Sequence, residues 1–282
     1  MKEFLLRRFL TALIVMWGVS TLVFFLIHFV PGDPVQAMLG ETALESDIEN
    51  LREKLGLNEP LYIQYKNYFS GLLKGDLGTS IVSGRKVSKE ILSHFPATME
   101  LALASIFIAL LISFPLGLLS AVKKDSFWDL TATGVSTLGL AIPNFWLGPL
   151  LIILFSVKLG IFPVSGRGSI AHIVLPAITL GTALAALLTR IIKTSLLEEL
   201  KEDYVRLALA KGLSKDKVLF KHVLRNAMIP IITILALQIG SLLTGAIITE
   251  TIFSWPGIGR LIIRAINQRD YPLVQGIILF IA

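Results

Sequence analysis

Three basic side chains lie at helical spacing in the last third of the sequence. Lys217, Lys221 and Arg225 follow one another at intervals of four residues, so a helix would place them in one stripe. The neighbouring arc is apolar and consists of Leu219, Phe220, Val223 and Leu224. Such a helix can lie on an anionic membrane surface or insert its apolar side into a groove of a partner protein. A solvated loop is the third interpretation, and periodicity does not decide among the three.

Gly212 divides the surrounding stretch, residues 203–230, into two predicted short helices that meet at a turn. Ser214 is expected to cap the second helix. Asp216 falls in its first turn, where a negative charge interacts favourably with the helix dipole.

Motifs for covalent or metal chemistry are missing from the sequence. The four histidines lie in separate segments, and no HExxH, GxSxG or GxxxxGK[ST] motif occurs. The chain contains no cysteine, which excludes disulfides and thiolate metal sites. We therefore expect no catalytic residue, no metal site, no cofactor and no ATP site in this chain.

The composition is that of a membrane protein. Hydrophobic residues make up 54% of the chain, charged residues 16%, and the mean hydropathy is +0.74. A membrane-spanning helix needs ~20 mostly apolar residues. The predicted spans are Phe9–Val30, Ala97–Val122, Leu130–Leu154, Ile173–Thr189 and Ala227–Thr249. A sixth apolar run, Pro272–Ala282, is too short to cross a bilayer. We expect an all-α, multi-pass bundle of six intended spans, the last one incomplete.

The net charge of +6 reports membrane orientation rather than binding to nucleic acid. Nine Lys or Arg residues lie between Arg190 and Arg225, whereas the loop 31–96 has seven basic and nine acidic residues. Because positive charge concentrates in cytoplasmic loops, the N-terminus and the loop 190–226 are predicted to be cytoplasmic. The first apolar run ends without a small-residue cleavage site, so residues 1–30 are interpreted as an uncleaved terminus and first span.

The loop 31–96 is predicted to form an external helical cap. Apolar residues recur at helical spacing in two segments, with Gly56 as a C-cap between them. The first series is Leu44, Ile48, Leu51 and Leu55, and the second is Leu61, Tyr65, Tyr68, Phe69 and Leu72. The cap either covers the span ends or docks an external partner. The remainder, residues 97–282, is the predicted core domain.

Two spans carry polar or helix-breaking residues. Pro143, with Asn144 beside it, predicts a kink in the third span. In the fifth span, one helical face is small or weakly polar and comprises Gln238, Ser241, Gly245 and Thr249. This face, with Asn144, is a candidate for helix packing or for lining a substrate pathway. No Asp, Lys or Arg falls in the middle of a predicted span, which weakens the case for an ion-driven carrier.

Residues 207–230 resemble the EAA loop of ABC-importer permeases. Of the general pattern, Ala208, Gly212 and Leu224 agree, and the peptide and nickel branch is much more similar. Its TARAKG-like and LRNAxIP runs resemble residues 207–212 and 224–230. Further motifs of that branch occur in order, namely PGDP at 31–34, LGLNEPL at 55–61, GDLG at 75–78, FSWPGIGR at 253–260 and RDYP at 269–272.

The resemblance implies the first permease subunit of a dipeptide, oligopeptide, glutathione or nickel importer with the type I importer permease fold. It implies a bacterial or archaeal inner membrane, a second homologous permease, two cytoplasmic ATPase subunits that bind ATP and Mg, and an external solute-binding protein. The residues expected to contact the ATPase are Ala208, Gly212, Ser214, Lys217, Lys221, Leu224 and Arg225. A self-sufficient carrier or channel is the alternative.

Overall fold

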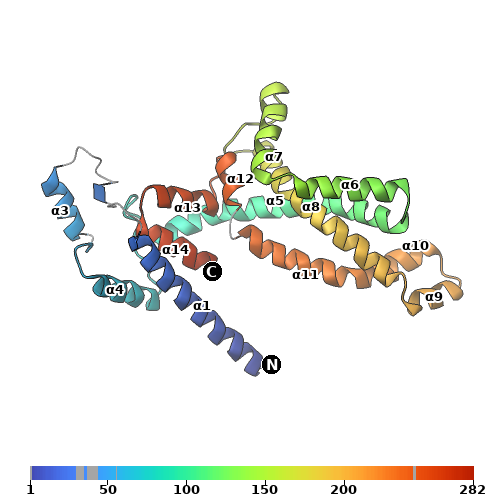
Figure 1. Cartoon of the computed structure of the whole chain (residues 1–282), viewed down its shortest axis with the longest axis horizontal. Helices are drawn as coiled ribbons and strands as arrows, with labels where there is room; N and C mark the ends of the chain where they lie inside the picture. The colour runs from blue at the N-terminus through green and yellow to red at the C-terminus, as the bar shows by residue number, and fades with distance from the viewer. Residues whose placement is uncertain (1, 30–34, 37–43, 55, 244–245) are drawn as a thin grey trace. The chain divides into compact units, whose positions relative to one another are not determined.

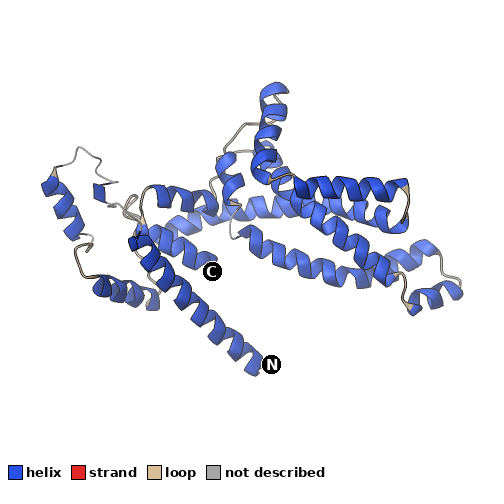
Figure 2. Cartoon of the chain, in the orientation of Figure 1, coloured by secondary structure: helices blue, strands red, loops and turns tan. Residues whose placement is uncertain are grey.

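The computed structural model describes residues 2–29, 35–36, 44–54, 56–243 and 246–282 (Figure 1). Within these residues every regular element is a helix, as Figure 2 shows, and strand-like pairing is limited to an isolated bridge between Thr79 and Lys86. The predicted all-α fold is therefore confirmed.

Four helical stretches in the described part of the chain are long and apolar enough to cross a membrane. They are α1 (Lys2–Phe29), α5 (Val87–Val122), α8 (Ile170–Glu199) and the stretch 215–243, which contains α10 (Lys215–Val218), the π-helix η2 (Leu219–Val223) and α11 (Leu224–Leu243). All four overlap predicted spans. α5 begins at Val87, earlier than predicted, because the polar residues of its first turns continue the helix without adding to the apolar run.

The third predicted span is bent. α6 (Phe127–Ala141) is followed by α7 (Asn144–Leu151) and the π-helix η1 (Ile152–Lys158), and the two parts meet at 99°. Ile142 leaves the helical conformation, with φ −84° and ψ 115°, because the ring of Pro143 disfavours it there. The predicted kink is confirmed, although the angle makes two helices where one continuous span was expected.

The fifth predicted span differs at its end. α11 ends at Leu243, and a separate helix, α12 (Ile247–Ile252), follows. Thr249 therefore lies on another helix than Gln238 and Ser241, so the predicted common face does not extend to it. The remaining helices are α3 (Glu45–Lys54), α4 (Leu61–Leu73), α9 (Asp203–Ala210), α13 (Ile258–Asn267) and α14 (Tyr271–Ile281).

The chain forms two compact units, residues 1–96 with 257–282 and residues 97–256. In the first unit α14 contacts both α1 and α13, and rings of α4 pack on α1. The helices predicted for the cap are present, and Gly56 after α3 has φ +67° as expected of a C-cap glycine. The functional division into residues 1–30, 31–96 and 97–282 stays a prediction.

The helix α8 is central to the second unit, where it contacts α6, α7, α11 and α12. Figure 1 shows it between α6 and α11. Gly181 allows the backbones of α5 and α8 to approach closely, since a Cβ atom at this position would lie 2.9 Å from the backbone oxygen of Ser105. This unit supports the loop to which the sequence assigned the main functional role.

Candidate functional site

Residues 199–227 form a compact helical loop at the end of α8. α9 ends before Gly212, whose φ of +82° is accessible to glycine but costly for residues with a Cβ. The Ser214 side chain then accepts a hydrogen bond from the Lys217 backbone N–H at 3.4 Å and caps α10. The predicted pair of short helices, the glycine turn and the serine cap are all confirmed.

One face of this loop is buried. Val205, Val218 and Val223 are at most 4% exposed and belong to the same apolar cluster as Leu188 and Leu196 of α8. Ala208 and Leu224, two of the predicted coupling residues, pack against this cluster. The loop and α8 therefore share one close-packed apolar cluster.

A hydrogen bond also ties α9 to α8. The Tyr204 hydroxyl donates to a carboxylate oxygen of Glu199 at 2.6 Å. Burial, with a smaller contribution from Glu199, raises the pKa of the Tyr204 phenol.

The opposite face of the loop is exposed and both basic and apolar. Lys217, Lys221 and Arg225 lie on the surface, as do Gly212 and Ser214. Large apolar side chains lie there too, with Leu207 57% and Phe220 56% exposed. Aromatic side chains and arginine are enriched at protein interfaces, so Phe220 and Arg225 make this face suited to bind a partner.

The candidate pathway residues lie on different helices of the second unit. Asn144 begins α7 and is half-buried. Gln238 is half-buried and Ser241 is exposed, both on α11. α7 and α11 both contact α8, which is their common neighbour. Gly245 lies outside the described residues. Whether these positions line a pathway or a helix seam stays a prediction.

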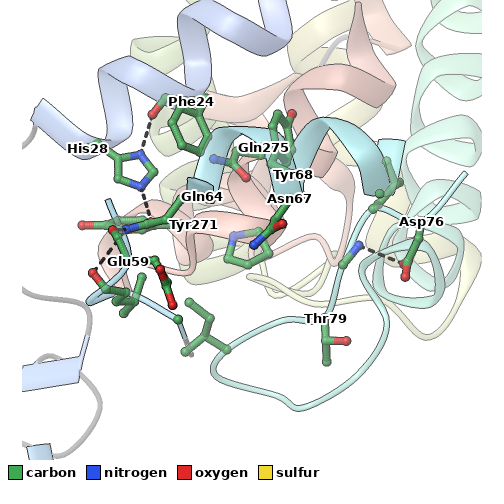
Figure 3. Close-up of a pocket in the computed structure, with 17 residues that line it drawn as sticks. Phe24, His28, Glu59, Gln64, Asn67, Tyr68, Asp76, Thr79, Tyr271 and Gln275 are labelled. Carbon is green, nitrogen blue, oxygen red and sulfur yellow. Dashed lines mark hydrogen bonds between the residues drawn. The ribbon is translucent and has the colours of Figure 1, made fainter. Parts of the chain in front are cut away.

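A second feature, a cavity of about 460 Å³, lies in the first unit and is bordered by α1, α4 and α14 (Figure 3). Its aromatic lining comes from Phe24, Tyr68 and Tyr271, its carboxylates from Glu59 and Asp76, and an imidazole ring from His28. Amide side chains reach it from Gln64, Asn67 and Gln275. No sequence motif pointed to this set, because its members come from segments far apart in the chain.

His28 and Gln64 hold the wall between α1 and α4. The Nδ1 atom of His28 lies 2.7 Å from the backbone oxygen of Phe24, and its Nε2 atom lies 3.2 Å from the Gln64 side-chain oxygen. The Gln64 amide nitrogen donates to the backbone oxygens of Leu57 and Glu59 at 3.2 Å and 2.7 Å. These bonds occupy both side chains, so neither is free for a ligand.

A metal centre finds no support in the described residues, where no three His, Asp or Glu side chains lie close enough to hold an ion.

The comparison with protein families shows the family to which the chain belongs. Residues 113–282 match the family described as "Binding-protein-dependent transport system inner membrane component". Residues 1–102 match its N-terminal counterpart, "Binding-prot-dependent transport system membrane comp, N-term". The chain belongs to this family of ABC-importer permeases. The permease is thus a multi-pass inner-membrane protein.

Several relatives match the permease over its whole length. The dipeptide transport system permease protein DppB of Escherichia coli (strain K12) is 41% identical, covering 100% of the chain and 93% of the relative. The di/tripeptide transport system permease protein DppB of Pseudomonas aeruginosa is 43% identical with the same coverage. The glutathione transport system permease protein GsiC of Escherichia coli (strain K12) is 42% identical, covering 99% and 91%.

The fold also resembles a solved transporter. An inward-facing structure of the MetNI methionine ABC transporter matches with a TM-score of 0.51 and 18% identity, covering 62% of the permease and 79% of that chain. At this identity the likeness concerns the fold alone, and it agrees with the type I importer fold expected from the sequence.

Proposed function

We propose that the permease forms one half of the translocation pathway of an ATP-driven importer of short peptides. The relatives that match it over its full length are named for the transport of dipeptides, di/tripeptides and glutathione. Nickel, which the resemblance left open, is not among these names. The proposed partners are a second homologous permease, two cytoplasmic ATPase subunits that bind ATP and Mg, and an external solute-binding protein.

The two-faced loop 199–227 carries the proposal of ATP coupling. Its exposed basic and apolar face offers a surface for an ATPase, while its buried face packs against α8. Closure of two ATPase subunits on ATP would pull this loop and its counterpart together. α8 and its neighbours would follow as a rigid body and open the pathway alternately to each side.

The orientation follows from the same assignment. The coupling loop and the N-terminus face the cytoplasm, and the helices α3 and α4 face outside. Because the chain contains no cysteine, a single cysteine at Lys215 or Asn58 is a clean reporter of sidedness. We expect an impermeant maleimide added to intact cells lacking an outer-membrane barrier to label Asn58→Cys but not Lys215→Cys. The reverse pattern would overturn the orientation.

The coupling assignment is tested at Gly212. Proline cannot adopt its φ of +82°, whereas asparagine tolerates the left-handed region better than most residues. We expect Gly212→Pro to abolish ATP-driven uptake of a labelled dipeptide with membrane insertion unchanged, and Gly212→Asn to retain most of the uptake. Normal uptake by the proline variant would contradict the assignment.

The partners are tested by mild-detergent purification of the tagged permease from its native membrane. Recovery of a second permease and two ATPases with Walker motifs supports the proposal. Dipeptide transport by the permease alone in liposomes, without an ATPase, would instead establish the self-sufficient carrier.

A further inference from the structure

The cavity in the unit formed by residues 1–96 and 257–282 has the size and lining of a small-molecule site. Its volume of about 460 Å³ lies within the ~300–1,000 Å³ that is usual for ligand pockets. Aromatic and aliphatic side chains supply its apolar wall, and a few polar side chains converge on it, which is the usual composition of such pockets.

Gln275 provides the observation that points to a ligand. This residue is only 6% exposed, and the described part of the chain offers its amide no hydrogen-bond partner. Figure 3 shows the amide between the rings of Phe24 and Tyr68, at the wall of the cavity. Gln275 lines the cavity, so its amide is accessible from there. A ligand that supplies both a donor and an acceptor would pair the oxygen and the nitrogen of this amide.

The charged side chains that line the cavity indicate which charge a ligand would carry. Glu59 and Asp76 contribute carboxylates, and none of the lining residues, all of which the structure describes, is Lys or Arg. His28 also lines the cavity, and its two ring nitrogens lie within hydrogen-bond distance of the Phe24 backbone oxygen and the Gln64 side-chain oxygen. Asp76 already accepts a hydrogen bond from the Gly78 backbone N–H at 3.0 Å, which leaves Glu59 as the less occupied carboxylate. With two carboxylates and no Lys or Arg in the lining, the cavity favours a positively charged group on the ligand.

The uncharged side chains of the cavity indicate which other groups the ligand would carry. Asn67 presents a second amide to the cavity, again without a hydrogen bond to any residue that the structure describes. The rings of Phe24 and Tyr271 offer apolar surface for a side chain. The lining therefore combines a carboxylate, two amides and aromatic rings.

We propose that this cavity binds a small molecule with a primary ammonium group, an amide and an apolar side chain. Glu59 would hold the ammonium group, Gln275 and Asn67 the amide, and the aromatic wall the side chain. An amino-acid amide is the smallest molecule with these three groups, and the N-terminal residue of a short peptide presents the same set. The inference concerns binding to this chain and does not rest on the proposed transport function.

The test uses phenylalanine amide and N-acetyl-phenylalanine amide, which differ in the charged amine. Binding to the full chain in lipid nanodiscs is measured by isothermal titration calorimetry. We expect saturable binding of phenylalanine amide and affinity for the acetylated probe lower by about tenfold or more, since a charge-assisted contact is lost. Equal affinities, or no saturable binding of phenylalanine amide, would overturn the proposal.

Two variants locate the site. Glu59→Gln keeps the shape of an exposed side chain and should weaken binding of phenylalanine amide by about tenfold. Gln275→Leu removes the buried amide and should also weaken it by about tenfold. Glu53→Gln, an exposed carboxylate of α3 outside the cavity, is the control and should change the affinity by less than about twofold.

Thermal melting of each variant shows whether it is folded. Because Gln275 is buried, its replacement carries the greater risk of misfolding, and the exposed Glu59 then decides the outcome alone. A folded Glu59→Gln variant with unchanged affinity for phenylalanine amide would contradict the proposal.

Discussion

The Lys193 ammonium of α8 lies 2.5 Å from the Asp129 carboxylate of α6. The same carboxylate accepts hydrogen bonds from the Ser120 hydroxyl and, at 3.1 Å, from the Asp125 backbone N–H. The two charged side chains are only 23% and 10% exposed, so water screens them weakly. Loss of one partner leaves the other charge enclosed and unpaired, which is usually more costly than loss of both.

We predict that Asp129→Ala destabilises the permease more than Lys193→Met does. The alanine variant removes the acceptor of four donors, whereas the methionine variant leaves Asp129 with Ser120, Asp125 and Thr133. The expected cost is about 2–3 kcal/mol for Asp129→Ala and about 1–2 kcal/mol for Lys193→Met, below the ~3–5 kcal/mol of fully buried pairs. Melting temperatures in detergent measure the order.

A nearby exposed pair provides the control for this prediction. Lys124 lies 3.7 Å from Asp125, with side chains 56% and 82% exposed. Exposed pairs contribute ~0–1 kcal/mol, so Lys124→Met should leave the melting temperature nearly unchanged. If Lys124→Met and Lys193→Met lowered the melting temperature equally, the enclosure of the Lys193–Asp129 pair would have no effect on its strength.

Asp270 at the start of α14 is expected to be intolerant even of asparagine. Its Oδ1 atom accepts from the backbone N–H groups of Ile81 at 3.1 Å and Leu273 at 3.3 Å, while its Oδ2 atom accepts from Ser80 and Val82. An amide NH₂ in place of either oxygen would face donors. We predict that Asp270→Asn lowers the free energy of unfolding by about 1–3 kcal/mol.

The exposed Asp47 of α3 supplies the comparison for Asp270. Asp47→Asn should not change the melting temperature measurably. If Asp270→Asn behaved in the same way, the four-donor arrangement around its carboxylate would be wrong.

Two glycines should respond differently when a neighbour is trimmed. A Cβ atom at Gly276 would lie 2.3 Å from a methyl group of Val87, whereas at Gly181 it would lie 2.9 Å from the Ser105 backbone oxygen. We predict that each alanine variant loses about 1–3 kcal/mol. Val87→Ala should recover stability for Gly276→Ala, because it removes the obstructing methyl group.

The helix backbone at Ser105 cannot be trimmed in this way. Ile108→Ala removes the Cγ2 methyl group near Gly181 but leaves the Ser105 backbone oxygen and its own Cβ atom in place, so it should recover little stability for Gly181→Ala. Gly240→Ala is the control, since nothing lies within 4 Å of its Cβ position. Full recovery by Ile108→Ala would mean that the backbones of α5 and α8 separate readily.

Features governed by neighbours in sequence could be predicted, and those governed by tertiary contacts could not. The turn at Gly212 and the cap at Ser214 follow from local backbone rules, and the structure has both. The kink at Pro143 was predicted for the same reason. Its angle of 99° was not, because packing of α7 against α8 and α12 contributes to it.

The cavity and the enclosed ion pair lay beyond sequence reasoning. Glu59 and Gln275 are separated by most of the chain, and only the fold brings them to one cavity. Asp129 and Lys193 fall just outside the predicted spans, so the apolar blocks gave no sign of their pairing. The one local signal was Ser126, three residues before Asp129, a spacing typical of a helix N-terminus.

Within the coupling loop, different side chains are expected to serve binding of the ATPase and folding of the permease. Phe220 is 56% exposed, whereas Val223 is fully buried in the apolar cluster with α8. Phe220→Asp should leave the melting temperature within about 1 °C, because it removes little buried surface. Uptake of a labelled dipeptide and co-purification of the ATPase should both fall by about tenfold or more, since an exposed aromatic anchor of an interface is lost.

Two matched variants complete the test. Val223→Asp should lose folded protein, because an unpaired charge would be buried. Phe220→Leu keeps an apolar side chain at the surface and should retain most of the uptake. If Phe220→Asp remained fully active, the exposed face of the loop would not be the surface that binds the ATPase, and the basic stripe of Lys217, Lys221 and Arg225 would need another role.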